Sequence, residues 1–234
     1  MTTKVFGSQV LEVKDLNPNV KSLKLSVPNG FEFTPGQYLS LSMDIEGKKV
    51  RTPYSIASIP NRKKFIEFCI KIVKGSKSSE YISNLKKDDE VELFGPLGKF
   101  VVDKISKRRD LVFISTGTGI APFRSMITYL LKKGFKNQIL LLKGFRNEEE
   151  ILYDNDFNEL KKRHKNFEFY NILSKPKEKN YENKGHVQDF MDKYISKDFL
   201  GDFYLCGLNA MIEDVVKKLK KRDVSERKIF YEKY

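Results

Sequence analysis

Residues 111–122 read LVFISTGTGIAP, and this stretch decides the fold of the second half of the chain. The apolar residues of 111–115 predict a buried strand, and Gly117 and Gly119 then allow a sharp turn. Pro122 suits the first turn of the helix that follows, because the N–H that proline lacks has no helical partner there. A strand, a glycine turn and a helix in this order are typical of an α/β domain.

The glycine turn of residues 115–119 is also the first candidate binding site. Glycines let the backbone approach a phosphate, and the helix N-terminus offers free N–H groups to an anion. Many α/β proteins need such a turn for packing alone, so both interpretations stay open on this loop. If the loop binds a nucleotide, the contacts are expected from Thr116, Gly117, Thr118, Gly119 and Pro122.

The alternation of strands and helices continues to the end of the chain. Four more strands are predicted, over 139–143, 167–173, 203–206 and 228–231. Four amphipathic helices are predicted, over 122–132, 148–163, 187–194 and 210–221. This pattern predicts a doubly wound parallel sheet, whose ligands bind at the carboxyl ends of the strands. We expect an α/β nucleotide-binding domain over residues 110–234.

The first half of the chain has a different pattern. Short β-rich runs are predicted at 20–27, 38–43, 65–73 and 91–94, and turns such as Pro28-Asn29-Gly30 separate them. Six or so strands in about 100 residues predict a small antiparallel β-barrel, with one helix near 78–85. We expect this domain over residues 1–103.

The length and composition permit two such domains. A chain of 234 residues can form two domains of about 100 to 130 residues, each with its own core. Its apolar stretches are far shorter than the roughly 20 residues that span a bilayer, and residues 1–9 lack a signal-peptide core. We therefore expect a cytoplasmic protein without a membrane segment. Two cysteines and two histidines argue against an iron-sulfur site or a bound metal.

A formal net charge of +13 favours acidic partners through long-range attraction. Nucleic acid, an anionic membrane and an acidic redox protein all meet this condition. So does a lysine-rich surface that only keeps the protein solvated. The charge by itself does not choose among them.

Polar residues follow three other predicted strands. Lys143-Gly144-Phe145-Arg146 and Ser174-Lys175-Pro176-Lys177 place cations and a hydroxyl where the adenosine ribose of a dinucleotide would lie. Basic residues there favour a 2′-phosphate, and ordinary surface lysines are the alternative. Cys206-Gly207 ends the fourth strand, near the reactive end of such a nucleotide, and a small buried thiol is the alternative.

Three segments of the first half form a candidate flavin site. Residues 51–58, 75–81 and 95–100 combine a cation for a pyrophosphate, an aromatic ring, hydroxyls and a helix N-terminus. Each segment taken singly has a turn-and-packing explanation. Their combination upstream of a dinucleotide-type domain predicts a flavin.

The motifs, in this order, resemble those of the ferredoxin-NADP reductase superfamily over almost the whole chain. The similar segments are Phe33-Thr34-Pro35-Gly36-Gln37-Tyr38, Tyr54-Ser55 of an R-x-Y-S motif, Gly117 to Pro122, Gly144 to Arg146, Cys206-Gly207 and the terminal Glu232-Lys233-Tyr234. One departure concerns the R-x-Y-S motif, in which Thr52 takes the usual place of the arginine and Arg51 lies one residue earlier. Either a bulge brings Arg51 to the pyrophosphate or another cation replaces it.

The resemblance implies a FAD-dependent oxidoreductase that moves electrons between NADP(H), with NAD possible, and an acidic carrier such as ferredoxin or flavodoxin. It implies flavin contacts from Arg51, Tyr54, Ser55, Ser79, Gly95, Gly98 and Tyr234. Nucleotide contacts are expected from Arg146, Ser174, Lys175 and Gly207 besides the glycine loop, and Ser55, Cys206, Glu232 and Tyr234 would surround the hydride path. The alternatives are an NAD(P)H-flavin reductase, a reductase subunit of a larger oxidoreductase and, more remotely, a nucleic-acid-binding protein.

Overall fold

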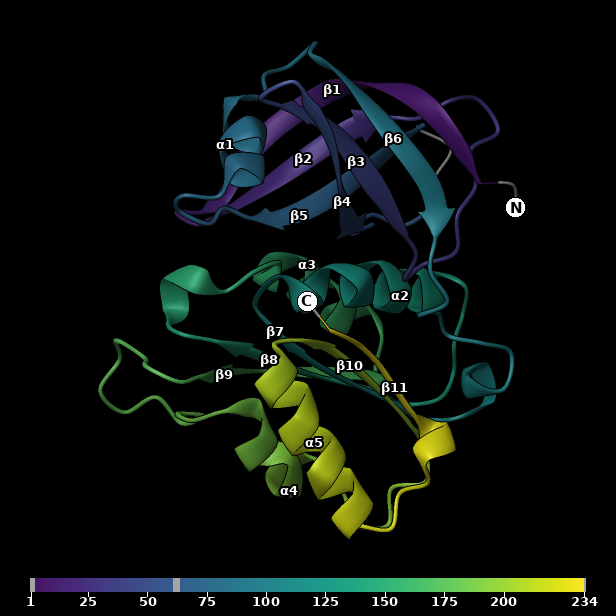
Figure 1. The fold of residues 1–234 in the computed structure, drawn as a ribbon. Coiled ribbons are helices and arrows are strands. Elements are labelled where there is room, and N and C mark those ends of the chain that lie inside the picture. Colours follow the sequence, from purple (N-terminus) through teal and green to yellow (C-terminus); the bar gives the residue numbers. More distant parts are fainter. Residues whose placement is uncertain (1–2, 61–63, 234) are drawn as a thin grey trace. The chain divides into compact units, whose positions relative to one another are not determined.

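The computed structural model describes residues 3–60 and 64–233. Their contacts form two units, one of Met1–Val101 with Ala121–Tyr129 and one of Val102–Ile120 with Leu130–Tyr234 (Figure 1). Among the described residues, no helix has the length and apolar character needed to cross a membrane.

The first unit is a curled antiparallel sheet. Its strands are β1 (Lys4–Asn17), β2 (Val20–Ser26), β3 (Tyr38–Ile45), β4 (Lys48–Ser55), β5 (Phe65–Lys71) and β6 (Glu90–Leu97), in the spatial order β4-β3-β6-β1-β2-β5. An isolated bridge between Ile56 and Phe68 links the end of β4 to β5, at the opposite edge of the sheet. This confirms the predicted antiparallel barrel, and the predicted helix is α1 (Lys77–Asn84).

Alternation of side chains explains why this sheet curls around one core. In β3 the side chains of Leu39, Leu41 and Met43 are buried, and they share a cluster with Phe68 of β5. The turn Glu46-Gly47 has positive φ at both residues, 54° and 74°, as a two-residue hairpin between β3 and β4 requires.

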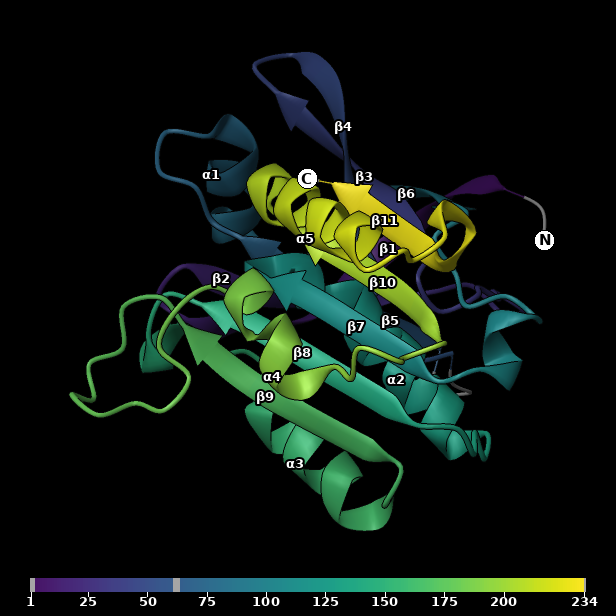
Figure 2. The same ribbon diagram turned by 90° about the horizontal axis from the view of Figure 1, so that it is seen from below.

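The second unit is a parallel sheet with helices on both faces. Its strands are β7 (Leu111–Thr116), β8 (Ile139–Phe145), β9 (Phe167–Leu173), β10 (Asp202–Gly207) and β11 (Ile229–Lys233), in the order β11-β10-β7-β8-β9. α3 (Asp154–Arg163) lies on one face of the sheet, and α4 (Met191–Tyr194) and α5 (Asn209–Lys221) lie on the other (Figures 1 and 2). The strand order reverses at β7, which confirms the doubly wound topology and marks where ligands bind in such sheets.

Two predicted helices differ from those in the structure. The helix expected over 148–163 is a 3-10 turn at Glu148–Glu150 followed by α3, because Tyr153 takes a left-handed conformation with φ 57° between them. The helix expected over 187–194 is a 3-10 segment, Val187–Phe190, that continues into the short α4.

α2 (Ile120–Lys132) is divided between the two units by its contacts. The Ser125 hydroxyl donates to the Ser58 carbonyl at 2.6 Å, and Arg124 donates to the Ala57 carbonyl at 3.2 Å. These bonds explain why Ala121–Tyr129 groups with the barrel residues, whereas the sequence pattern assigned the whole of 110–234 to the second domain. The expected boundaries, 1–103 and 110–234, stay a prediction.

Candidate functional site

The turn after β7 leaves backbone open for a ligand. A 3-10 segment, Gly117–Gly119, leads directly into α2, and no side chain caps its start. Gly117 is exposed with φ 54°, and a Cβ built on it would meet no atom within 4 Å. Free N–H groups beside open space at a helix start are suited to a phosphate. Pro122 lies in the first turn of α2, as predicted.

The other two glycines of the site have packing roles. A Cβ at Gly119 would lie 2.3 Å from the Cys206 carbonyl oxygen, and one at Gly207 would lie 2.2 Å from Thr116 Oγ1. Thr116 Oγ1 also accepts a hydrogen bond from Leu208 N at 3.1 Å. The loops after β7 and β10 therefore lock together, and this contact accounts for Gly119 and Gly207 without a ligand.

Cys206 lies between two polar residues at the carboxyl end of the sheet. The strand register pairs it with Ser115 of β7 on one side and with Glu232 of β11 on the other. Cys206 and Ser115 are both 0% exposed. Because it is completely buried, the Cys206 thiol lies beneath the loops rather than on their surface, which fits a small packing residue. Tyr234 lies outside the described residues.

The ends of β8 and β9 are held side by side. Ser174 N donates to the Phe145 carbonyl at 3.0 Å, and Lys175 N donates to the Arg146 carbonyl at 2.7 Å. The side chains of Arg146 and Lys175 are exposed, and the described part of the chain contains no ion pair to either. The structure thus brings Arg146, Ser174 and Lys175 together, with two positive charges available to an anion.

Acidic residues next to this pair are already engaged. The Glu148 carboxylate accepts hydrogen bonds from Lys177 N and Glu178 N at 2.9 and 3.0 Å, which lowers the pKa of Glu148. Glu149 forms an ion pair with Lys177. The charge on Lys177 is therefore neutralised, whereas those on Arg146 and Lys175 are not.

Lys143 does not belong to this exposed group of cations. The sequence pattern placed it among the residues near the ribose, but the structure buries it completely within the second unit. That placement was wrong, because aromatic rings from elements far along the chain enclose the side chain.

Tyr54 and Ser55 close β4 in the first unit. The Tyr54 ring lies 5.8 Å from the Phe68 ring, and burial raises the pKa of Tyr54 to about 12. Ser55 is buried as the last residue of β4, opposite Tyr38. The phenol of Tyr54 therefore stays protonated at neutral pH and can donate a hydrogen bond to a ligand.

Ser79 lies at the start of α1. Its hydroxyl oxygen accepts a hydrogen bond from Val73 N at 3.0 Å, and its own N–H donates to the Ser76 cap. The side chain is buried, so it fixes the loop that enters α1. This structural role is compatible with a flavin pyrophosphate nearby but does not require one.

Arg51 does not lie with Tyr54. The register between β3 and β4 runs from Ser42–Arg51 to Tyr38–Ser55 without a bulge, so Arg51 and Tyr54, three residues apart, point to opposite faces. Arg51 Nε donates to Ser42 Oγ at 3.3 Å, and its guanidinium lies 3.7 Å from Glu92. The bulge that could have brought Arg51 to the pyrophosphate is therefore absent between β3 and β4.

Gly95 and Gly98 also have packing explanations. A Cβ at Gly95 would lie 2.5 Å from the side chain of Leu39, and one at Gly98 would lie 3.0 Å from the ring of Tyr38. Both have positive φ, 149° and 100°. These glycines shape the end of β6 whether or not a cofactor binds.

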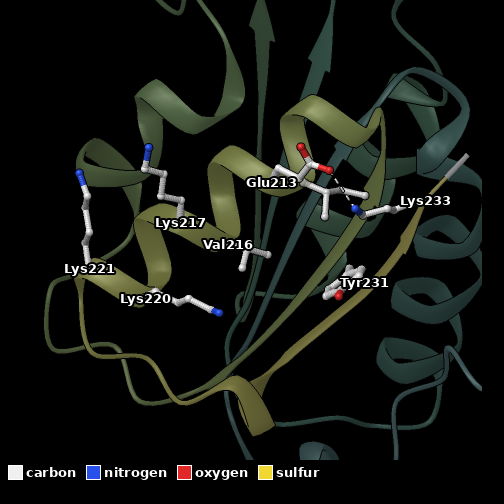
Figure 3. Close-up of a pocket in the computed structure, with 8 residues that line it drawn as sticks. Glu213, Val216, Lys217, Lys220, Lys221, Tyr231 and Lys233 are labelled. Atoms are coloured by element: carbon white, nitrogen blue, oxygen red, sulfur yellow. Dashed lines mark hydrogen bonds and ion pairs between the residues drawn. The ribbon is translucent and has the colours of Figure 1, made fainter.

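A basic groove of about 500 Å³ lies between α5 and β11 in the second unit (Figure 3). Ile212, Val216 and Tyr231 form its apolar part, and lysines with one glutamate surround them, namely Lys217, Lys220, Lys221, Lys233 and Glu213. Lys233 pairs with Glu213 at 3.0 Å and Lys220 with Glu226 at 2.5 Å. The sequence analysis missed this groove, although lysines at 217, 220 and 221 share one side of a helix.

The described residues contain no cluster of side chains able to hold a metal ion.

Two family models match the chain in succession. The oxidoreductase FAD-binding domain matches residues 8–102, and the oxidoreductase NAD-binding domain matches residues 113–217. The first match covers the curled sheet, and the second covers the parallel sheet up to α5.

Named relatives match almost the whole chain. The reductase component DmpP of phenol 2-monooxygenase from Pseudomonas sp. strain CF600 is 34% identical over 236 residues, which cover 98% of this chain and 65% of the relative. Ferredoxin-NADP reductase B of Sorangium cellulosum is 28% identical, with 98% and 97% covered. The chain thus spans 65% of the length of the first of these relatives and nearly all of the second.

Solved structures agree with these matches. The Amycolatopsis reductase GcoB superposes with a TM-score of 0.89 at 28% identity, covering 99% of this chain and 70% of that one. The ferredoxin-NADP reductase of Plasmodium falciparum superposes with a TM-score of 0.82 at 25% identity, covering 98% and 96%.

Proposed function

Because this chain belongs to the ferredoxin-NADP reductase superfamily, we propose that it is a flavoenzyme that moves electrons between a nicotinamide nucleotide and a one-electron protein carrier. The observation that supports this function best is the open turn at Gly117. Its backbone faces free space at the start of α2, at the point where the strand order reverses. Bound FAD would supply the conversion between hydride and single-electron transfer.

The proposal assigns binding roles to residues of both units. Tyr54 and Ser55 would contact the flavin, with the protonated Tyr54 phenol as a hydrogen-bond donor. The N–H groups after Thr116 would bind the nucleotide pyrophosphate, and Arg146, Ser174 and Lys175 would bind its adenosine end. We leave Arg51 out of the flavin site, because Ser42 and Glu92 hold it on the other face of β4.

We propose NADPH as the preferred nucleotide. Arg146 and Lys175 offer two cations without carboxylate partners, whereas the neighbouring Glu148 is already bonded to backbone N–H groups. A 2′-phosphate is bound well by such a pair, and a ribose 2′-hydroxyl gains less from it. NAD(H) would use the same site with lower affinity.

Binding of FAD tests the flavin half of the proposal. The purified protein is titrated with FAD, and retention after gel filtration is compared for the wild type and Tyr54→Ala. We expect one FAD per chain in the wild type and a lower occupancy in the variant. If the wild type retains no FAD, or if the variant retains as much as the wild type, the flavin site is placed wrongly.

An acidic carrier in the cytoplasm is the proposed protein partner. The net charge of +13 and the groove between α5 and β11 both favour it, because Lys217 and Lys221 have no ion pair within the described residues. The names of relatives favour a second candidate, an electron-transfer component that serves an oxygenase. Both candidates require electron transfer to another protein.

The partner proposal is tested by charge reversal. The double variant Lys217→Glu/Lys221→Glu should slow reduction of an acidic flavodoxin and reduce the dependence of the rate on salt concentration. Lys136→Glu/Lys165→Glu is a matched control, because these two exposed lysines precede β8 and β9, which lie toward the opposite edge of the sheet from β11. Equal rates for both double variants would contradict docking at the groove, and a salt-independent wild-type rate would contradict an acidic partner.

A further inference from the structure

Lys143 is a fully buried lysine in the middle of the parallel sheet's second strand. It is 0% exposed on β8, and its ammonium lies 4.8 Å from the ring centroid of Phe157 on α3 and 4.7 Å from that of Phe169 on β9. Removing an ammonium group from water is costly unless it is paired and hydrogen-bonded.

The Lys143 ammonium holds one end of the connection between β8 and α3. It donates to the Leu152 carbonyl at 3.3 Å and to Asp154 Oδ1 at 3.1 Å. The Asp154 carboxylate also accepts hydrogen bonds from Asn171 at 2.8 Å and from Asn158 at 3.0 Å. One cation therefore fixes residues 152–154 against the strand that the connection has just left.

The same connection contains the nucleotide-binding residue proposed above. Arg146 begins it, and the Arg146 carbonyl accepts the bond from Lys175 N. Glu148 then holds the backbone of residues 177 and 178. The left-handed Tyr153 ends the connection, next to the two groups that Lys143 binds. Lys143 thus fixes the end of the connection that leads into α3, at residues 152–154. Backbone hydrogen bonds from the residues after β9 fix its beginning, at Arg146.

We propose that Lys143 is a positioning residue for nucleotide binding, whose ammonium keeps residues 146–154 in the conformation that presents Arg146 beside Lys175. The proposal rests on the proposed function in one respect, namely that Arg146 and Lys175 bind the nucleotide. Lys143 itself is buried and does not touch the ligand.

Nucleotide affinity should fall at alkaline pH, where the Lys143 ammonium loses its proton. Burial lowers the pKa of Lys143 to about 8, against the opposing charges of Asp154 and Asp156 on α3. Tyr181 also faces this cluster, since its hydroxyl donates to the Asn171 carbonyl. The pKa of Tyr181 is raised mainly by burial and, to a smaller extent, by the negative charge of Asp154. Above pH 8 the ammonium loses its proton and the attraction for Asp154, so the connection loosens and nucleotide affinity falls.

The first test compares nucleotide binding by the wild type, Lys143→Met and Asp154→Asn, each FAD-loaded at pH 7 and titrated with NADP+ and with 2′,5′-ADP. Lys143→Met keeps the length of the side chain without its charge. We expect its Kd to rise about tenfold, with little change in the reduction rate at saturating NADPH. Because methionine removes a buried charge, its unfolding midpoint should not fall. Asp154→Asn should weaken binding in the same direction and serves if Lys143→Met does not fold.

The second test follows pH. From pH 7 to 9.5 the wild-type Kd should rise about tenfold relative to that of Lys143→Met, which lacks the titrating group. Wild-type affinity in Lys143→Met and Asp154→Asn at pH 7, or parallel pH profiles for wild type and Lys143→Met, would overturn the proposal. Arg146→Ala distinguishes an error in the proposed nucleotide site from an error in the role of Lys143. If it leaves nucleotide affinity unchanged, the proposed nucleotide site is wrong, and if it weakens binding while Lys143→Met does not, only the role of Lys143 is wrong.

Discussion

Thr116 and Gly207 approach so closely that a Cβ on residue 207 would lie 2.2 Å from the Thr116 hydroxyl oxygen. The contact joins the ends of β7 and β10, and Thr116 reinforces it by accepting a hydrogen bond from Leu208 N. The open Gly117 follows Thr116 directly. The geometry of the proposed phosphate turn therefore depends on a packing contact that involves no ligand.

This arrangement predicts different outcomes for substitutions of two neighbouring glycines. Gly207→Ala should lower the free energy of unfolding by about 2 to 4 kcal/mol, because it adds both a clash and an unfavourable φ. Gly117→Ala meets no clash and should cost only about 1 kcal/mol, yet its methyl group would lie where the phosphate approaches and should weaken nucleotide binding. Chemical denaturation measures the loss of stability, and titration with NADP+ measures the loss of nucleotide affinity.

Gly134→Ala is the matched control for Gly117→Ala. Gly134 also has a positive φ, 79°, and open space where a methyl group would lie, but it is in the turn after α2. Gly134→Ala should lower the free energy of unfolding by as much as Gly117→Ala does, and it should keep wild-type nucleotide affinity. Equal nucleotide affinity for Gly117→Ala and Gly134→Ala would place the phosphate elsewhere.

Substitutions at Arg51 and Tyr54 should separate two faces of β4. Arg51→Ala should leave FAD occupancy unchanged, and it should alter the free energy of unfolding by less than about 0.5 kcal/mol, because the guanidinium is half-exposed. Tyr54→Ala should reduce FAD occupancy. Loss of FAD from Arg51→Ala would show that this arginine reaches the flavin despite its bonds to Ser42 and Glu92.

Nucleotide preference should depend on the two unpaired cations at the ends of β8 and β9. The double variant Arg146→Ala/Lys175→Ala should reduce the NADPH to NADH ratio of kcat/KM by about tenfold to a hundredfold, mainly through the KM for NADPH. Steady-state kinetics with both nucleotides measure it, and Lys177→Ala is the control, since Lys177 is paired with Glu149. A wild-type enzyme that uses NADH as well as NADPH would contradict the preference itself.

Lys143 should make stability depend on pH with a definite sign. Its pKa in the folded protein, about 8, is below the usual value of 10.5, so between these values the unfolded chain binds more protons. The free energy of unfolding of the wild type, relative to Lys143→Met, should therefore rise from pH 8 to 10.5 by a few kcal/mol at about 1.4 kcal/mol per unit. Urea denaturation of both proteins at several pH values measures the difference. A constant difference would show that the lysine keeps its ordinary pKa.

Much of the fold could be predicted because its strands are short apolar or β-rich runs bounded by turn residues. The strand predicted over 111–115 is Leu111–Thr116, and the one predicted over 167–173 is Phe167–Leu173. Apolar runs bounded by turn residues are sufficient for a parallel strand that is buried on both faces. The break at Tyr153 could not be predicted, since residues 148–163 contain no glycine or proline and a left-handed conformation is uncommon for a tyrosine.

The site was predicted in its motifs but not in every side chain. Position after a strand correctly predicted that Arg146, Ser174 and Lys175 lie together, because carboxyl ends of parallel strands meet at one edge, and their contact with a nucleotide stays a prediction. The charge of Lys143 suggested an exposed side chain, but the side chain is buried. Its burial could not be predicted, because the rings of Phe157 and Phe169 that enclose it come from α3 and β9. For Arg51 the sequence did contain a signal: residues three apart in a strand face opposite sides, so its separation from Tyr54 excluded a shared face unless a bulge intervened.

The central claim is that nicotinamide nucleotide reduces a flavin bound to this chain, and rapid anaerobic mixing of the FAD-loaded protein with NADPH tests it most directly. The visible flavin absorbance should disappear at a rate that saturates with NADPH concentration, with one NADPH consumed per flavin, and addition of an oxidised flavodoxin should then restore it. A bound flavin that stays oxidised with NADPH and with NADH alike would contradict the account.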